Sequence, residues 1–236
     1  ALGAALQSGI MVHDGDTLPF GRLGSIMGIP VSDQSRSDRA LAPCILAGNA
    51  QRRAIFAVDE ILGPDVNAEP TFEQVAKFRY LRRVLDEGLR LWPTAPAFAR
   101  SPRETTVLSS GHTMRPEDWA IVILPMMHRD RSVWGEDADR FDPDRFLPEN
   151  SRGRPPHTYK PFGTGERSCI GRQFALHEAI LVLARMLHRY DIAGDPSYEL
   201  EIAERLTLMP TGFELALSRR TPNVTAPLGQ DAATRG

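Results

Sequence analysis

The chain has few cysteines and no long hydrophobic segment. Only two cysteines occur among its 236 residues, Cys44 and Cys169, too few for a disulfide framework or a cysteine-rich zinc site. The longest apolar run, residues 120–127, is far shorter than the roughly 20 residues of a membrane-spanning helix. The N-terminus lacks the pattern of a signal peptide. We therefore expect a cytoplasmic protein without membrane contact.

Strong net charge is also lacking. The formal net charge is −2, while 42% of the residues are hydrophobic and 25% are charged. A nearly neutral chain has no basic field that would attract nucleic acid. Its apolar content is typical of a folded globular protein rather than a disordered one. The length and composition predict one or two folded domains and no nucleic-acid partner.

The pattern of apolar residues changes near residue 50. Residues 1–50 hold no helical or strand period for long, so we expect a segment of uncertain structure there. Residues 51–221 form the main region, and residues 222–236 are expected to be a tail or linker. Apolar spacing predicts helices at 52–62, 77–91 and 172–190, and Thr71 with Gln74 predicts a capping box at a helix start between the first two.

Short β-rich runs predict strands at 105–108 and 119–124, and a final strand pair at 199–202 and 212–218. The stretch 137–156 is expected to be a long functional loop. Because the helix predicted at 172–190 is apolar on most sides, we expect it to lie deep in the core.

The residues around Cys169 have the pattern of a reactive or ligating thiol. Gly163, Gly165 and Gly171 lie within nine residues, just before a predicted helix. Glycine allows positive φ and close approach, and backbone N–H groups of such a loop, with the helix dipole, favour negative charge. The pattern predicts a thiolate, which is either a nucleophile or a metal ligand.

At this point the residues leave three specific interpretations of Cys169 open, one without chemistry and two in which the thiolate acts. The residue could be a small buried cysteine without chemistry. It could be the nucleophile of a cysteine hydrolase, with His157 or His177 as its partner. It could also bind zinc, although Cys44 is remote in the sequence.

The full string at residues 162–171, Phe-Gly-x-Gly-x-Arg-x-Cys-x-Gly, resembles the haem-binding signature of the cytochrome P450 monooxygenases at every fixed position. The resemblance implies that Cys169 is the axial thiolate ligand of the iron of haem b. It also implies that Phe162 packs near the thiolate and tunes the iron potential, and that Arg167 pairs with a haem propionate. The cofactor-binding positions are then Phe162, Gly163, Gly165, Arg167 and Gly171.

Two further motifs match the same family. Glu87 and Arg90 fit its Glu-x-x-Arg pattern on a predicted helix, where residues three apart share a face. Arg145, within Pro-Asp-Arg-Phe at 143–146, fits the arginine of the family's loop motif. By resemblance these three residues form a buried structural network around the haem and are not catalytic.

The match extends to a subgroup, the bacterial self-sufficient fatty-acid hydroxylases, whose haem domain is fused to a flavin reductase. Similar segments are 91–98, 128–130, 134–135 and 173–179. The resemblance implies an apolar substrate, favouring a fatty acid, and a reductase partner that would supply FMN, FAD and NADPH from outside this chain. It places Ala95, Ala97 and Leu206 along the substrate channel. Ordinary core positions are the alternative for these three.

The resemblance implies a mainly α (α+β) fold, the C-terminal half of the P450 architecture, with small β-sheets and a long helix after the cysteine loop. The acid–threonine pair of the family's distal helix is missing. Its best match, 45–51, has Ala50 and Gln51 at those positions, so no catalytic residue is identified. We predict a haem-thiolate monooxygenase inserting one oxygen atom from O2 into a C–H bond. The alternative is a truncated, non-catalytic fragment.

Overall fold

The computed structural model describes residues 17–19, 49–194, 197–198, 201–204, 207–211 and 214–221. Within these residues the α-helices are α4 (Asn49–Leu62), α5 (Phe72–Val75), α6 (Arg79–Leu91), α7 (Leu124–Met127), α8 (Arg131–Trp134), α9 (Pro148–Ser151) and α10 (Arg172–Arg189). The 3-10 helices are η1 (Pro143–Phe146) and η2 (Gly165–Arg167). The strands are β1 (Thr17–Pro19), β2 (Ala97–Arg100), β3 (Thr106–Val107), β4 (Thr113–Met114), β5 (Ala120–Ile123), β6 (Tyr190–Gly194), β7 (Glu201–Glu204), β8 (Leu208–Thr211) and β9 (Glu214–Arg219).

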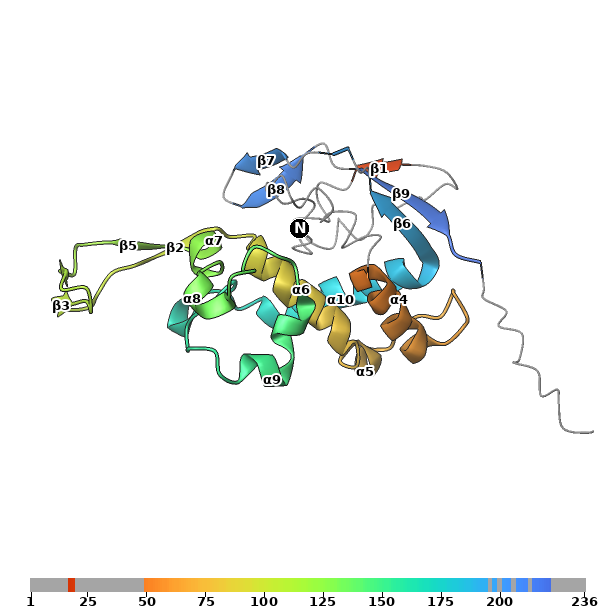
Figure 1. Cartoon of the computed structure of the whole chain (residues 1–236), viewed down its shortest axis with the longest axis horizontal. Helices are drawn as coiled ribbons and strands as arrows, with labels where there is room; N and C mark the ends of the chain where they lie inside the picture. Colours follow the sequence, from red (N-terminus) through yellow and green to blue (C-terminus); the bar gives the residue numbers. More distant parts are fainter. Residues whose placement is uncertain are drawn as a thin grey trace, which may run out of the picture.

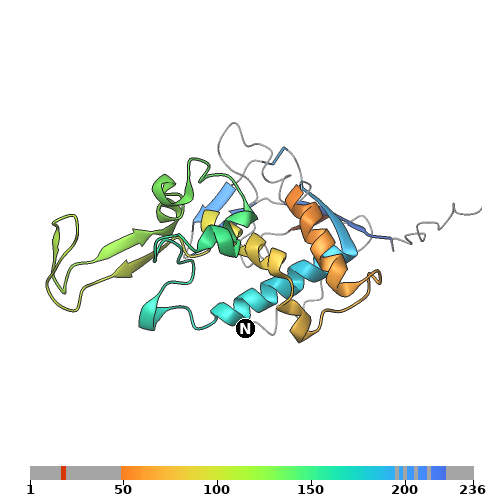
Figure 2. The same ribbon diagram turned by 60° about the horizontal axis from the view of Figure 1, so that its bottom comes forward.

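The helices α4, α6 and α10 contact one another and form the centre of the molecule (Figure 2). Each contributes an apolar face to one shared core, with side chains such as Val58, Leu81, Leu85 and Ala184 almost completely buried. Burial of these faces is the main favourable contribution to folding. The α6 helix therefore has a fixed position from which its polar side chains can be placed.

Local signals set the ends of these helices as the sequence predicts. Gly63 ends α4 at a φ of +80°, and its N–H donates to the carbonyl oxygen of Asp59 over 2.9 Å. The capping box at Thr71 is confirmed: its hydroxyl accepts from the N–H of Gln74, whose side chain accepts from the N–H of Thr71. The α6 helix begins at Arg79, two residues later than predicted, and ends before Trp92-Pro93.

The C-terminal strands pair differently from the prediction. The expected pair, 199–202 with 212–218, is wrong, because β7 pairs with β8 in one hairpin. The strand β9 instead lies between β6 and β1, antiparallel to both. Residues 17–19, within the segment whose structure the sequence left uncertain, therefore belong to the same sheet as the end of the chain's main region.

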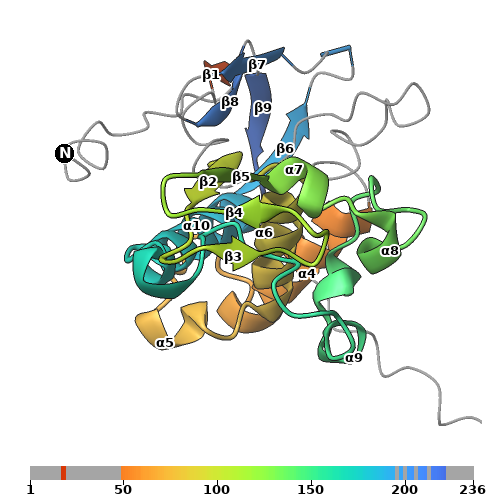
Figure 3. The same cartoon turned by 90° about the vertical axis from the view of Figure 1, so that its left-hand side faces the viewer.

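A β-ribbon projects from the helices (Figure 1) and lies toward the viewer in Figure 3. The strands β2 and β5 form its base, and β3 and β4 form its outer part. Both strands predicted here are present in shorter form. The predicted loop at 137–156 contains the short helices η1 and α9, and η1 packs against α6.

The α10 helix covers nearly the predicted span but is not buried along its whole length. Leu183, Ala184 and Leu187 are buried, whereas Phe174 in its first turn is 62% exposed. The prediction of a helix deep in the core is thus correct for its C-terminal part and wrong for its start. Among the described residues no helix combines the length and apolarity needed to cross a membrane.

Candidate functional site

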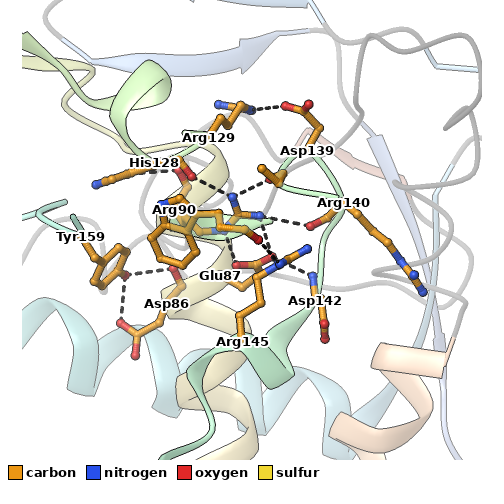
Figure 4. A network of polar contacts seen from close by, with 12 residues as sticks. Asp86, Glu87, Arg90, His128, Arg129, Asp139, Arg140, Asp142, Arg145 and Tyr159 are labelled. Atoms are coloured by element: carbon orange, nitrogen blue, oxygen red, sulfur yellow. Dashed lines mark hydrogen bonds and ion pairs between the residues drawn. The ribbon is translucent and has the colours of Figure 1, made fainter. Parts of the chain in front are cut away.

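A buried ion pair lies on α6, where Glu87 and Arg90 share one face of the helix (Figure 4). Neither side chain has any exposed surface. The Nε atom of Arg90 lies 2.6 Å from Oε2 of Glu87, and its Nη2 lies 2.9 Å from Oε1. Such a two-point contact between guanidinium and carboxylate is stronger than a single hydrogen bond and fixes the angle between the groups.

Arg90 also forms hydrogen bonds with the backbone of the segment 128–140, which packs against α6. Its Nη1 donates to the carbonyl oxygens of His128 (2.8 Å) and Ala138 (2.6 Å), and its Nη2 donates to that of Arg140 (3.1 Å). All five N–H groups of a guanidinium are donors, so one buried side chain holds three points of the 128–140 segment against the helix.

Arg145, from η1, is the third member that the motifs predicted. Its Nε lies 3.6 Å from Oε1 of Glu87, and its Nη1 and Nη2 donate to the carbonyl oxygens of Trp134 and Asp137. The N–H of Asp142 donates to the same Glu87 oxygen over 2.7 Å. The structure thus brings the three predicted network residues together.

The charge state of Glu87 follows from these neighbours. Burial raises the pKa of Glu87 above its ordinary value, and the hydrogen bonds from Arg90 and from the backbone of Asp142 offset this rise only in part. Every group in contact with the carboxyl oxygens is a hydrogen-bond donor, so the arrangement fits a carboxylate. Removing that charge would leave the guanidinium of Arg90 buried without its counter-ion.

Sequence reasoning missed two residues of this network, His128 and Tyr159. His128, completely buried, contacts the carbonyl oxygen of Arg90 through Nδ1 and the N–H of Lys160 through Nε2. The hydroxyl of Tyr159 donates toward Asp86, and burial raises its pKa well above the ordinary value. His128 lies in a segment that resembles the family, but no spacing rule shows that its ring joins two distant elements.

The loop that carries Cys169 is closed by its own backbone. The N–H of Cys169 donates to the carbonyl oxygen of Phe162 over 2.9 Å, and the N–H of Ser168 donates to that of Gly165 over 3.0 Å. Gly163 and Gly165 have φ values of +70° and +72°, a region that favours glycine. The predicted tight path therefore exists, and it presents Cys169 immediately before α10.

Cys169 is exposed and is a free cysteine within the part of the chain that the structure describes. A Cβ atom added to Gly171 would lie 3.9 Å from its Sγ, in van der Waals contact, so residue 171 borders the sulfur directly. The adjacent Ile170 is fully exposed, and Phe174 is largely exposed. A single accessible sulfur beside exposed apolar side chains fits the axial ligand of a flat, apolar prosthetic group, and so fits haem.

The structure gives little support to the other interpretations of Cys169, as a buried cysteine, a hydrolase nucleophile or a zinc ligand. Cys169 is not buried, which contradicts a purely structural role in the core. Within the described ranges, neither His157 nor His177 is hydrogen-bonded to it, and His177 instead stacks on Phe72. The same ranges contain no group of three or more His, Cys, Asp or Glu side chains arranged as a metal site. Cys44 lies outside the described residues.

Other side chains contact the loop at its edges. Arg100 donates through Nη2 to the carbonyl oxygen of Thr164 over 2.8 Å, and Arg103 forms an exposed ion pair with Glu166. The exposed Arg167 has no ion-pair partner in the part of the chain that the structure describes. The ring of Phe162 lies 5.8 Å from the guanidinium of Arg172.

The predicted substrate residues are only partly described. Ala95 and Ala97 are exposed, so the alternative that they are ordinary core positions is wrong. The N–H of Leu208 donates to the carbonyl oxygen of Thr94, which brings the β7–β8 hairpin beside this segment. Leu206 lies outside the described residues.

The best match to the distal motif has another role in the structure. Gln51, at the position of the motif's threonine, is buried on α4, and its Nε2 donates to the carbonyl oxygen of Ile192 in β6 over 3.1 Å. No helix in the described ranges carries an adjacent acid and threonine. Gln51 therefore supplies a hydrogen bond between α4 and β6, and residues 45–48 of the match lie outside the described residues.

Comparison with known proteins gives one consistent result. A family model described as Cytochrome P450 matches residues 40–217. The chain is 45% identical over 169 residues to a bifunctional cytochrome P450/NADPH–P450 reductase of Bacillus subtilis, and 44% identical over 179 residues to a self-sufficient cytochrome P450 monooxygenase of Aspergillus terreus. These alignments cover 72% and 75% of this chain but only 16% and 17% of the relatives.

A solved structure has the same arrangement. The crystal structure of a cytochrome P450, CYP102L1, superposes with a TM-score of 0.71 at 42% sequence identity, covering 78% of this chain and 41% of that one. The expected fold, mainly α with small β-sheets, is therefore confirmed.

Proposed function

The chain belongs to the cytochrome P450 family. From this premise we propose that residues 51–221 bind haem b through Cys169 and form part of the haem domain of a monooxygenase. The exposed, glycine-flanked thiol at the start of α10 is the observation that carries the proposal. Bound haem supplies an iron centre that activates O2 for insertion of one oxygen atom into a C–H bond, and a thiolate ligand favours O–O cleavage by donating electron density.

The loop residues hold the group. Cys169 provides the sulfur, and its backbone is kept in place by the carbonyl oxygen of Phe162. Gly171 borders the sulfur, where even a Cβ atom would be in van der Waals contact with Sγ. The exposed guanidinium of Arg167, which has no ion-pair partner among the described residues, suits a propionate, since arginine binds carboxylates with two parallel hydrogen bonds.

Glu87, Arg90 and Arg145 have a structural role in this proposal. Glu87 and Arg90 are completely buried, Arg145 is partly buried, and each contacts backbone of the segment between α7 and η1. Their function is to keep α6 and that segment together. They do not touch a reacting atom.

The substrate and electron donor follow from resemblance. Relatives named as bifunctional P450/NADPH–P450 reductases support a flavin reductase partner, with FMN, FAD and NADPH on that partner. An apolar substrate, favouring a fatty acid, is proposed to pass Ala95, Ala97 and Leu206. The exposure of Ala95 and Ala97 is compatible with this path.

The test is the absorbance of the haem-loaded chain. The protein is expressed with added haem precursor, purified, reduced and exposed to carbon monoxide. We expect the strongly red-shifted Soret band of thiolate-ligated haem, its loss in Cys169→Ser, and its retention in Cys44→Ser, the matched control. Absence of haem absorbance, or a band that survives in Cys169→Ser, contradicts the proposal.

A second candidate function is haem binding without turnover. The residues at the expected acid–threonine position are Ala50 and Gln51, and the side chain of Gln51 donates a hydrogen bond to the carbonyl oxygen of Ile192 in β6. Fatty-acid oxidation is measured with a P450 reductase and NADPH, counting product against NADPH consumed. A thiolate band with no oxidised product supports this candidate, and hydroxylated product eliminates it.

A further inference from the structure

The hydrogen bonds of His128 define the state of its ring. A backbone N–H can only donate, so the N–H of Lys160, 3.0 Å from Nε2, requires an unprotonated Nε2. The remaining proton then lies on Nδ1, which donates to the carbonyl oxygen of Arg90 over 3.1 Å. His128 is therefore a neutral imidazole in one tautomer, with an acceptor at one end and a donor at the other.

This ring connects the end of α6 to the cysteine loop. The carbonyl oxygen of Arg90 belongs to the last turn of α6, where helix carbonyls lack a partner within the helix. On the other side of the ring, the carbonyl oxygen of Lys160 accepts a hydrogen bond from the N–H of Gly163 over 3.0 Å. The carbonyl oxygen of Phe162, two residues after Lys160, accepts one from the N–H of Cys169. Two hydrogen bonds through His128 and two backbone bonds thus link α6 to Cys169.

The surroundings of His128 keep it neutral. The ring is completely buried, and burial lowers the pKa of His128 to about 4. Arg90 and Arg129 lie near it and oppose a second positive charge, and the ring of Tyr159 packs at 5.3 Å. The acceptor at Nε2 is therefore available at neutral pH.

We propose that His128 is a positioning residue, which sets the place of the cysteine loop relative to α6 through the N–H of Lys160. The inference rests on the proposed role of Cys169 as haem ligand. If His128 only fills space in the core, its replacement lowers stability without altering the loop or the ligation.

Two substitutions separate the acceptor from the donor. His128→Gln places an amide oxygen near the position of Nε2 and can accept from Lys160. His128→Asn places an amide nitrogen near Nδ1 and donates to Arg90, but it is too short to reach Lys160. His188→Asn is the control, because His188 is also a buried histidine with both ring nitrogens bonded, to Asp59 and Asp65, yet lies near the opposite end of α10.

The first readout is amide hydrogen exchange in the haem-free full chain. We expect His128→Asn to speed exchange in peptides spanning 160–171 by about fivefold or more, the factor corresponding to loss of one hydrogen bond. Peptides of α10 serve as the reference for global opening. His128→Gln should leave the ratio of loop to α10 exchange as in the unmodified chain. His188→Asn, which changes α10 itself, should not speed exchange in the loop more than in α10. Equal acceleration of both regions in His128→Asn overturns the proposal.

The second readout is the share of bound haem that shows the thiolate band after reduction and exposure to carbon monoxide. This share should be lower in His128→Asn than in the unmodified chain. In His128→Gln and His188→Asn it should equal that of the unmodified chain. A fall that follows only the melting temperature of each variant contradicts a positioning role. If the unmodified chain shows no thiolate band, the proposed function fails, while hydrogen exchange still decides whether His128 holds the loop.

Discussion

The Glu87–Arg90 network and the Cys169 loop lie at opposite extremes of burial in the same molecule. Glu87 and Arg90 have no exposed surface, and all their polar groups contact other parts of the protein. The loop residues 165–170 are exposed, and the loop is held mainly by its own backbone bonds.

This difference separates two ways of fixing a conformation. In the network, side chains far apart in the sequence determine one another, so loss of a single member leaves a buried charge without a partner. In the loop, the path depends on glycine conformations and on a few attachments at its edges. A network of this kind governs stability, whereas the loop is better placed to govern ligand binding.

The largest expected effect is that of Glu87→Gln. The change keeps the side-chain volume but removes the charge opposite Arg90, and it places an amide N–H₂ among donors. We expect a loss of about 3–5 kcal/mol in the free energy of unfolding, measured by urea denaturation of the full chain. The same change at Glu166, in the exposed pair with Arg103, should have no measurable effect. Similar losses in the two variants would show that burial does not make the Glu87 charge more important for stability than the exposed charge of Glu166.

Gly165→Ala tests the loop. A Cβ at this position meets no atom within 4 Å, so the cost comes only from the φ of +72° and amounts to about 1–2 kcal/mol. We expect haem affinity, measured by titration, to fall by about tenfold. Gly153→Ala is the control, because that glycine has open space and no positive φ. Unchanged affinity in Gly165→Ala would show that the loop path does not depend on this glycine.

The smallest effect is expected at Asp59, which binds Arg220 and His188 in a cluster more exposed than the Glu87 network. Burial raises the pKa of Asp59, but the hydrogen bonds from Arg220 and His188 outweigh it, so the pKa lies below the ordinary value of 3.8. The contribution to stability is therefore present above that pH and is lost as the pH falls through the lowered pKa.

Asp59→Asn should remove this acid-dependent loss, which we expect to be about 1 kcal/mol or less because the carboxylate is partly exposed. The measurement is the urea midpoint of both proteins between pH 7 and pH 3. A steeper acid loss in Asp59→Asn than in the unmodified chain contradicts the assignment.

Local signals in the sequence predict the elements more successfully than their pairing. The capping box at Thr71 and the end of α4 at Gly63 depend on neighbouring residues and are confirmed. The pairing of β9 with β1 and β6 was not predicted, because a strand's own residues do not specify its partner. The partner is chosen by long-range contacts whose loop-closure cost no local pattern reports.

The sequence alone determined the motif around Cys169, the Glu-x-x-Arg spacing on one helix face and the approximate span of α10. These features depend on residue type and helical period, which are local properties. Only the tertiary structure decided that Gln51 binds β6, that the first turn of α10 is exposed while its C-terminal half contributes to the core, and that His128 joins α6 to the cysteine loop. The physical reason is that a buried polar group must find its partner wherever the fold brings one within hydrogen-bonding distance.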